Sequence, residues 1–316
     1  MTAVAAAAAT VRALVLERPG CVRVEERPVP APGPGQVLVR VEGCGVCGSS
    51  LPLWEGRDWF SYPLAPGAPG HEGWGVVAAL GAGVAGPPPG TRVAFLSERA
   101  FAQTDVADAA ALVPLPPELD GLPFPGEAVG CAFNVLARSD VRPGQRVAVV
   151  GIGFLGALLV ALSAARGARV TALSRRPFAL RLAERLGAER ALTLDEAPDE
   201  EFERVLEAAG VQATLDVASR LTAERGRLVI AGYHQDGPRS VDMRLWNWRG
   251  IDVVNAHERD RSAAVDGMRA AVAAVASGQL DLRPLVTHVY PLDRAEEAFE
   301  AARTRPEGFL KAVVTP

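Results

Sequence analysis

The stretch Arg146-Val-Ala-Val-Val-Gly-Ile-Gly-Phe-Leu-Gly156 decides the fold expected of this 316-residue chain. Its first five residues form an apolar, β-branched run typical of a buried strand. Gly151, Gly153 and Gly156 then follow the G-x-G-x-x-G spacing, which allows a tight turn, a close approach by a pyrophosphate and close packing of helix on strand. Residues 154–166 predict that helix. This context favours dinucleotide binding over a glycine-rich packing turn.

The alternation of strands and helices continues after this loop. Short β-branched runs and amphipathic segments closed by glycines predict a parallel sheet with helices on both faces. Residues 202–209 fit either an exposed helix or a strand ending at Glu207. The expected strands are 169–173, 190–194 and 227–231, and the expected helix between the first two is 177–186.

The sequence pattern differs on the two sides of this α/β region. Up to about residue 125, short runs between Gly and Pro (22–24, 36–41, 75–79 and 91–95) predict an all-β or irregular domain. Residues 262–277 and 292–303 predict helices, and 286–290 and 309–314 predict strands.

Composition excludes several classes of protein. The chain is 49% hydrophobic and 22% charged, so it is neither disordered nor collagen-like, and its net charge of −4 disfavours a nucleic-acid partner. Residues 3–9 are apolar but lack a basic leader, which predicts a frayed tail, and no membrane role is expected. Four irregularly spaced cysteines predict a reducing, cytoplasmic location.

The end of the second strand of the sheet predicts which dinucleotide binds. An NAD site places a carboxylate roughly 20 residues after the glycine loop, where it accepts hydrogen bonds from the ribose. Here the position is Ser174, followed by Arg175 and Arg176. Because a guanidinium can pair with a 2′-phosphate, NADP is favoured over NAD. We expect Ser174 and Arg175 to bind it and Arg176 to be a solvated residue at the start of a helix.

A candidate metal site lies in the first domain. Cys47 and His71 both occur among glycines, and a thiolate, an imidazole and a carboxylate such as Glu72 are ligands that Zn²⁺ takes. A buried cysteine and a hydrogen-bonded loop histidine are the alternative explanation. The pair Cys44 and Cys47 also has redox spacing, but the sequence lacks the helix N-terminus that lowers a thiol pKa in such motifs.

From about Arg12 the chain resembles the zinc-dependent medium-chain dehydrogenase/reductase superfamily, which includes the alcohol dehydrogenases. The matching motifs occur in family order: Gly33-Pro-Gly-Gln-Val-Leu-Val-Arg40, the Cys47 segment, Gly70-His-Glu-Gly73, Gly90-Thr-Arg-Val93, Pro143-Gly-Gln-Arg-Val147, the glycine loop and Leu285-Val-Thr-His-Val-Tyr-Pro-Leu292.

The resemblance implies an α/β plus β fold, in which a GroES-like catalytic domain (residues 1–132 and 253–316) is interrupted by a Rossmann domain, a doubly wound parallel sheet (133–252). It implies hydride transfer between NADP(H) and a small-molecule alcohol or carbonyl, and a homodimer or homotetramer. A zinc-free quinone or enoyl reductase and an inert NADPH-binding protein remain the alternatives.

By this resemblance Cys47 and His71 are zinc ligands at one catalytic site. Glu127 and Cys131 are equal candidates for the next ligand, with core packing as the alternative role of Cys131, and Glu72 is a further candidate. The family's four-cysteine structural zinc lobe is missing after Val93. Where relatives usually carry an Asp that orients the histidine, this chain has Ser50.

Other residues are expected at the site. Ser49 would pass the alcohol proton. The loop residues Phe154 and Leu155, and Tyr233 after the last strand, are expected at the cofactor from their places in the sequence. Lys311 resembles a family lysine near the cofactor, with a solvated side chain as the alternative. Tyr233 and His234 are also pocket candidates, with a surface loop as the alternative, and the aromatic cluster Trp54, Trp59, Phe60 and Tyr62 would line the substrate pocket or pack under its loop.

Overall fold

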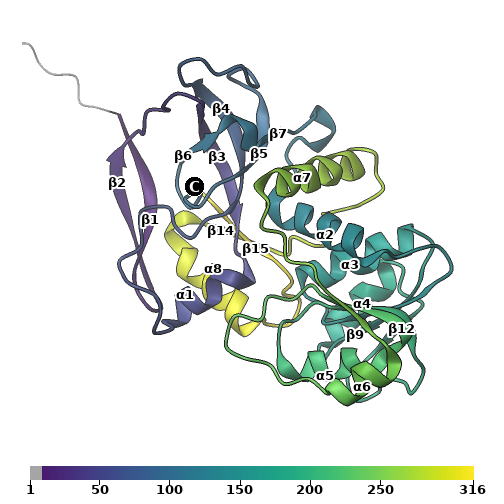
Figure 1. Cartoon of the computed structure of the whole chain (residues 1–316). Helices are drawn as coiled ribbons and strands as arrows, with labels where there is room; N and C mark the ends of the chain where they lie inside the picture. Colours follow the sequence, from purple (N-terminus) through teal and green to yellow (C-terminus); the bar gives the residue numbers. More distant parts are fainter. Residues whose placement is uncertain (1–8) are drawn as a thin grey trace, which may run out of the picture. The chain divides into compact units, whose positions relative to one another are not determined.

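The glycine-loop region lies in a parallel sheet with the strand order β10-β9-β8-β11-β12-β13, of which Figure 1 labels β9 and β12. The structure, a computed structural model, describes residues 9–316, so residues 3–8 of the expected N-terminal tail lie outside the described chain. The order runs outward in both directions from β8, the first strand of this sheet in the sequence, as in a doubly wound fold. The strands are β8 (Arg146–Val150), β9 (Arg169–Leu173), β10 (Arg190–Leu192), β11 (Phe202–Glu207), β12 (Thr222–Ile230) and β13 (Asp252–Asn255).

Helices cover both faces of this sheet. α3 (Phe154–Ala165) contacts β8 and β9, and α4 (Pro177–Arg185) contacts β9 and β10. In Figure 1 both lie above the sheet, while α5 (Gln212–Leu221) and α6 (Met243–Arg249) lie below it. This confirms the predicted Rossmann class.

Glycines end α3 and α4, as the sequence predicted. Gly167, with φ 78°, donates its N–H to Ala164, and the next N–H bonds Ser163 O, the pattern of a Schellman motif. Gly187 closes α4 in the same way, donating to Glu184. A glycine in the left-handed region therefore turns the chain from each helix toward the next strand.

Of residues 202–209, which the sequence left open, Phe202–Glu207 form a strand, as in the alternative that ended at Glu207. Val205 pairs in parallel with Ala148 of β8 and with Leu228 of β12, so β11 lies inside the sheet. The charges that suggested a helix sit at its start, where Arg204 bonds Asp140 at 3.0 Å and Glu203 accepts from the Arg146 N–H. These charges have partners at the start of the strand, so the residues that follow, Val205 and Leu206, can be buried.

The β-rich part of the chain forms a second sheet in the order β14-β15-β3-β4-β5-β7, with β6 paired to β3. Its strands are β3 (Gln36–Gly45), β4 (Glu72–Leu80), β5 (Arg92–Leu96), β6 (Thr104–Asp108), β7 (Leu112–Pro114), β14 (His288–Pro291) and β15 (Ala312–Thr315). A separate antiparallel pair consists of β1 (Thr10–Arg18) and β2 (Cys21–Pro28). The remaining helices are α1 (Leu51–Glu55), α2 (Gly126–Ser139), α7 (Arg261–Ala276) and α8 (Ala295–Thr304).

The chain divides into two compact units. The first comprises the described residues up to Glu127, His288–Thr304 and Ala312–Pro316, and the second comprises Ala128–Thr287 and Arg305–Lys311. The N-terminal boundary falls near the predicted residue 132, but the C-terminal one falls well beyond the predicted residue 252. β13 pairs in parallel with β12 and extends the second unit's sheet to Asn255. After it, α7 packs closely on α2, where a Cβ on Gly130 would lie 2.7 Å from the backbone N of Met268.

Candidate functional site

The register of β3 against β4 creates a cluster of possible metal ligands in the first unit. Gly45, at the end of β3, pairs with Glu72, at the start of β4. Cys47 follows the first of these residues and His71 precedes the second, so the pairing brings both side chains to one end of the sheet. Among the described residues, the ligand atoms of Cys47, His71 and Glu72 form a group that lies within 4.8 Å.

The hydrogen bonds of His71 leave one ring nitrogen directed at this cluster. Nδ1 lies 2.9 Å from the carbonyl oxygen of Pro69, which can only accept, so Nδ1 carries the proton. Nε2 lies 3.4 Å from Oγ of Ser49. Metal-ligating histidines typically donate their second ring N–H in this way, which fixes the orientation of the ring. The residues present therefore fit a zinc ion.

Negatively charged groups surround the His71 ring. Burial lowers the pKa of His71, but the charge and hydrogen bond of Cys47 and the Glu127 and Glu72 carboxylates raise it by more, to about 11. A concentration of negative charge around an imidazole favours a cation, either a proton or a metal ion.

Glu127 and Cys131, the two candidates for a further ligand, lie one turn apart on α2. Neither belongs to the group formed by Cys47, His71 and Glu72 among the described residues. Glu127 does act on His71 through its charge. The structure thus brings together three of the five predicted metal residues.

Ser50 occupies the position of the Asp that the family resemblance would place beside the histidine. It is 1% exposed, and its Oγ has no hydrogen-bond partner among the described residues. The backbone carbonyl of Pro69, not a carboxylate, orients His71 here. The sequence could not reveal this substitute, because a backbone acceptor leaves no trace in residue type.

The aromatic residues after the cysteine have different environments. Trp54 is 6% exposed and stacks on Phe299 with ring centroids 5.2 Å apart, so it packs in the core. The Tyr62 hydroxyl donates to the Leu53 carbonyl. Trp59 is 60% exposed and packs against Phe60.

In the second unit, the glycine loop makes a tight turn between β8 and α3. Gly151 has φ 100°, and its N–H donates to Leu173 O at 2.8 Å. A Cβ on Gly156 would lie 2.0 Å from the Gly151 carbonyl oxygen, whereas one on Gly153, which caps α3, would meet no atom within 4 Å. Gly156 is thus needed for helix packing and Gly153 keeps the N-terminus of α3 open. Phe154 and Leu155 form the first turn of that helix.

At the end of β9, Ser174 is buried and Arg175 is exposed. The prediction that Arg176 is solvated is wrong. Its guanidinium is partly buried and donates to the carbonyls of Phe309, at 2.7 Å, and Ile152, at 3.1 Å. Burial, together with the nearby Arg305, lowers its pKa. Arg176 therefore ties the β9–α4 turn to a segment that is distant in sequence.

Lys311 is 4% exposed, and its Nζ lies 4.9 Å from the centroid of the Phe154 ring. A cation over an aromatic face at this distance is stabilised by the ring's quadrupole. The contact places Lys311 beside the first residue of α3, next to the glycine loop.

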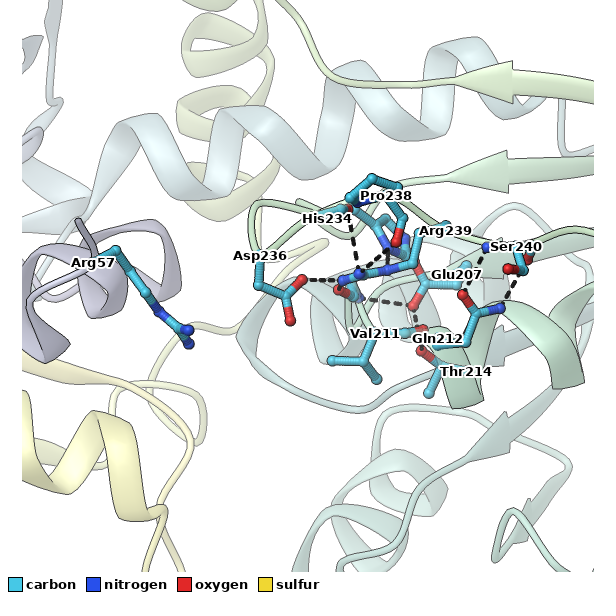
Figure 2. Close-up of polar contacts among 12 residues, drawn as sticks. Arg57, Glu207, Val211, Gln212, Thr214, His234, Asp236, Pro238, Arg239 and Ser240 are labelled. Carbon is cyan, nitrogen blue, oxygen red and sulfur yellow. Dashed lines mark hydrogen bonds and ion pairs between the residues drawn. The ribbon is translucent and has the colours of Figure 1, made fainter. Parts of the chain in front are cut away.

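A buried carboxylate that the sequence did not single out as functional organises the carboxyl end of β11 and β12 (Figure 2). One oxygen of Glu207 accepts from the N–H groups of Ala209 and Gly210 and from the Thr214 hydroxyl, at 2.7–2.9 Å. The other lies 2.9 Å from His234 Nε2, and Arg239 Nε donates to His234 Nδ1 at 2.8 Å. Both ring nitrogens of His234, a predicted pocket residue, are thus engaged by Glu207 and Arg239.

Tyr233, by contrast, is 53% exposed and stacks on His257 with centroids 5.2 Å apart. The two rings follow β12 and β13, neighbouring parallel strands, at their carboxyl ends. This is the edge at which doubly wound sheets bind their ligands.

The sequence did contain a signal for Glu207: it is a single carboxylate at the end of an otherwise buried strand.

Known proteins match both parts of the chain. Residues 33–117 match the family "Alcohol dehydrogenase GroES-like domain", and residues 155–274 match "Zinc-binding dehydrogenase". Sorbitol dehydrogenase of Gallus gallus is 30% identical, over 94% of each chain. The chain belongs to the zinc-dependent medium-chain dehydrogenase superfamily.

Solved structures of this superfamily agree in fold. A thermostable alcohol dehydrogenase from Pyrobaculum aerophilum has a TM-score of 0.83 at 26% identity, covering 98% of this chain and all of its own. A zinc-binding dehydrogenase from Sinorhizobium meliloti, solved with NADP bound, has a TM-score of 0.84 at 25% identity with the same coverage. The protein is therefore an oxidoreductase of the alcohol dehydrogenase family.

No helix among residues 9–316 is both long and apolar enough to cross a bilayer.

Proposed function

We propose that this dehydrogenase transfers hydride between NADP(H) and an alcohol or carbonyl substrate with the help of one zinc ion. The observation that carries the proposal is the convergence of Cys47, His71 and Glu72 at the end of β3. A thiolate, an imidazole and a carboxylate suit zinc, and three protein ligands leave a position open for substrate. Glu127 and Cys131 stay candidates for a further ligand.

Zinc, when bound, supplies a Lewis acid that lets an alcohol lose its proton near neutral pH or polarises a carbonyl for attack. The chain's own residues would move that proton. Ser49 Oγ, near the ring of His71, can accept a proton from the substrate hydroxyl and pass it to water. The nicotinamide carries out the redox step, and the protein orients the two reactants.

The NADP preference rests on the end of β9. Ser174 and Arg175 stand where an NAD site has its carboxylate, and an arginine can bind a phosphate through two hydrogen bonds. The Sinorhizobium relative with bound NADP supports the same choice. The small-molecule substrate, the homodimer or homotetramer and the cytoplasmic location stay predictions.

Zinc binding to the apoprotein at pH 7 is expected to release about one proton, because His71 must be neutral to coordinate a metal. Since the pKa of His71 is about 11, zinc competes with this proton at every lower pH. The apparent zinc affinity should therefore rise as the pH rises toward that value. Isothermal titration of zinc in two buffers with different ionisation enthalpies measures the release. Identical heats in both buffers would contradict the prediction.

Arg175→Ala is expected to weaken NADPH binding roughly tenfold or more and NADH binding less than about twofold, because only NADPH has the phosphate. Cofactor fluorescence titration measures both dissociation constants. Arg185→Ala, which removes another exposed arginine of the second unit from α4, is the control and should change neither. Equal loss for both cofactors would refute the phosphate role of Arg175.

A further inference from the structure

The segment Arg305–Lys311 belongs to the second unit although it follows α8, a helix of the first. Two contacts hold it beside the β9–α4 corner. Arg176 donates to Phe309 O at 2.7 Å, and Arg181 of α4 forms an ion pair of 2.9 Å with Glu307. Arg305, the first residue of this segment, lies close enough to Arg175, the second residue after β9, for the two charges to interact.

Three guanidinium groups gather at this corner. Desolvation and the charge of Arg175 lower the pKa of Arg305, and Arg305 in turn acts on Arg176. Arg176 is bound to backbone carbonyls, which leaves its charge unneutralised. The one carboxylate that acts on Arg176, Glu307, is paired with Arg181.

Arg175 and Arg305 differ from Arg176 in having no partner. Neither makes a hydrogen bond or an ion pair with any residue between 9 and 316. Arg305 also has φ 50°, in a region that residues other than glycine seldom adopt, so the backbone holds it in a defined turn. Two cations that have no hydrogen-bond or ion-pair partner among the described residues, and whose charges act on each other, favour the binding of a multivalent anion.

We propose that Arg305 is a specificity-determining residue that binds the 2′-phosphate of NADP together with Arg175. The inference rests on the proposed function, which assigns this corner to the adenosine ribose. A phosphate monoester carries close to two negative charges and three acceptor oxygens, so it can accept from two guanidinium groups at once. A ribose 2′-hydroxyl offers neither, so Arg305 adds to the discrimination between NADP and NAD.

The test uses fragments of the cofactor, so it does not depend on the unknown substrate or on zinc. The full-length protein is titrated calorimetrically with 2′,5′-ADP, with 5′-AMP and with inorganic phosphate. The variant is Arg305→Asn, because asparagine tolerates the left-handed backbone of this position. Arg225→Asn is the matched control, since Arg225 is an exposed arginine of the same unit with φ 53°.

We expect the wild type to bind 2′,5′-ADP more tightly than 5′-AMP and much more tightly than inorganic phosphate. Arg305→Asn should reduce the preference for 2′,5′-ADP over 5′-AMP roughly tenfold, with 5′-AMP binding unchanged. Arg225→Asn should leave all three affinities at the wild-type level.

Three results overturn the inference in distinguishable ways. If Arg175→Ala loses the preference and Arg305→Asn keeps it, or if Arg305→Asn weakens both nucleotides equally, Arg305 has no specific role and the proposed NADP preference stands. If the wild type itself binds 2′,5′-ADP no better than 5′-AMP, the proposed cofactor is wrong and the role of Arg305 falls with it. Binding of inorganic phosphate as tight as that of 2′,5′-ADP would show a free-phosphate site instead.

Discussion

Cys47→Ser is expected to lower turnover of alcohol or carbonyl substrates about 1000-fold or more while leaving NADPH binding within about twofold of wild type. The substitution replaces a thiolate ligand with a hydroxyl that stays protonated, so zinc loses both a bond and a compensating charge. A bound metal contributes several kcal/mol of charge stabilisation, and each 1.36 kcal/mol is worth about tenfold in rate. The glycine loop belongs to the other compact unit, which the substitution leaves intact.

The measurement needs a substrate, which a screen of polyols, simple alcohols and aldehydes against NADP(H) absorbance provides. Cys21→Ser is the matched control, because Cys21 is a partly buried free cysteine on β2. It should keep the wild-type rate. Turnover by Cys47→Ser within tenfold of wild type would remove Cys47 from the catalytic site and favour a zinc-free reductase.

The second large effect concerns two glycines of one loop that should fail in different ways. Gly156→Ala places a methyl group 2.0 Å from the Gly151 carbonyl oxygen, so α3 must move away from β8. Overpacking of this kind costs about 1–3 kcal/mol of unfolding free energy. Thermal unfolding should show a clearly lowered midpoint together with lost cofactor binding.

Gly153→Ala is its matched partner. A Cβ at residue 153 meets no protein atom within 4 Å, and the backbone there is extended, which any residue can adopt. We therefore expect an unchanged melting temperature but NADPH binding weakened roughly tenfold or more, because the methyl group stands where the pyrophosphate approaches. If Gly153→Ala binds NADPH normally, the dinucleotide does not lie on this loop.

The sequence predicted the region from β8 to α4 almost to the residue, because its elements are buried, periodic and punctuated by glycines. β11 stayed ambiguous, since Glu203 and Arg204 mask a strand whose charges are satisfied only by contacts with Arg146 and Asp140. α2 was not predicted as a helix. Its Gly130 weakens the helical pattern, but a Cβ there would lie 2.7 Å from the backbone N of Met268, so close packing explains the glycine.

The candidate site was predictable where chemistry is local and not where it depends on tertiary packing. Cys47 and His71 could be found from their glycine-rich surroundings, and the register of β3 on β4 explains why they meet. Arg305 could not be found, because it reaches the end of β9 only through the contacts of the segment that begins with it. The prediction that Arg176 is solvated was wrong for the same reason, because its partners Phe309 and Ile152 reach it only in the folded chain.

The metal content and activity of the purified wild-type protein decide whether this dehydrogenase uses zinc. We expect about one zinc ion per chain, loss of turnover after chelation and recovery when zinc is restored, as for a catalytic metal. NADPH binding should persist throughout, since the glycine loop contains no metal ligand. Full reductase activity in protein that contains no appreciable zinc would show that the reaction does not use the metal.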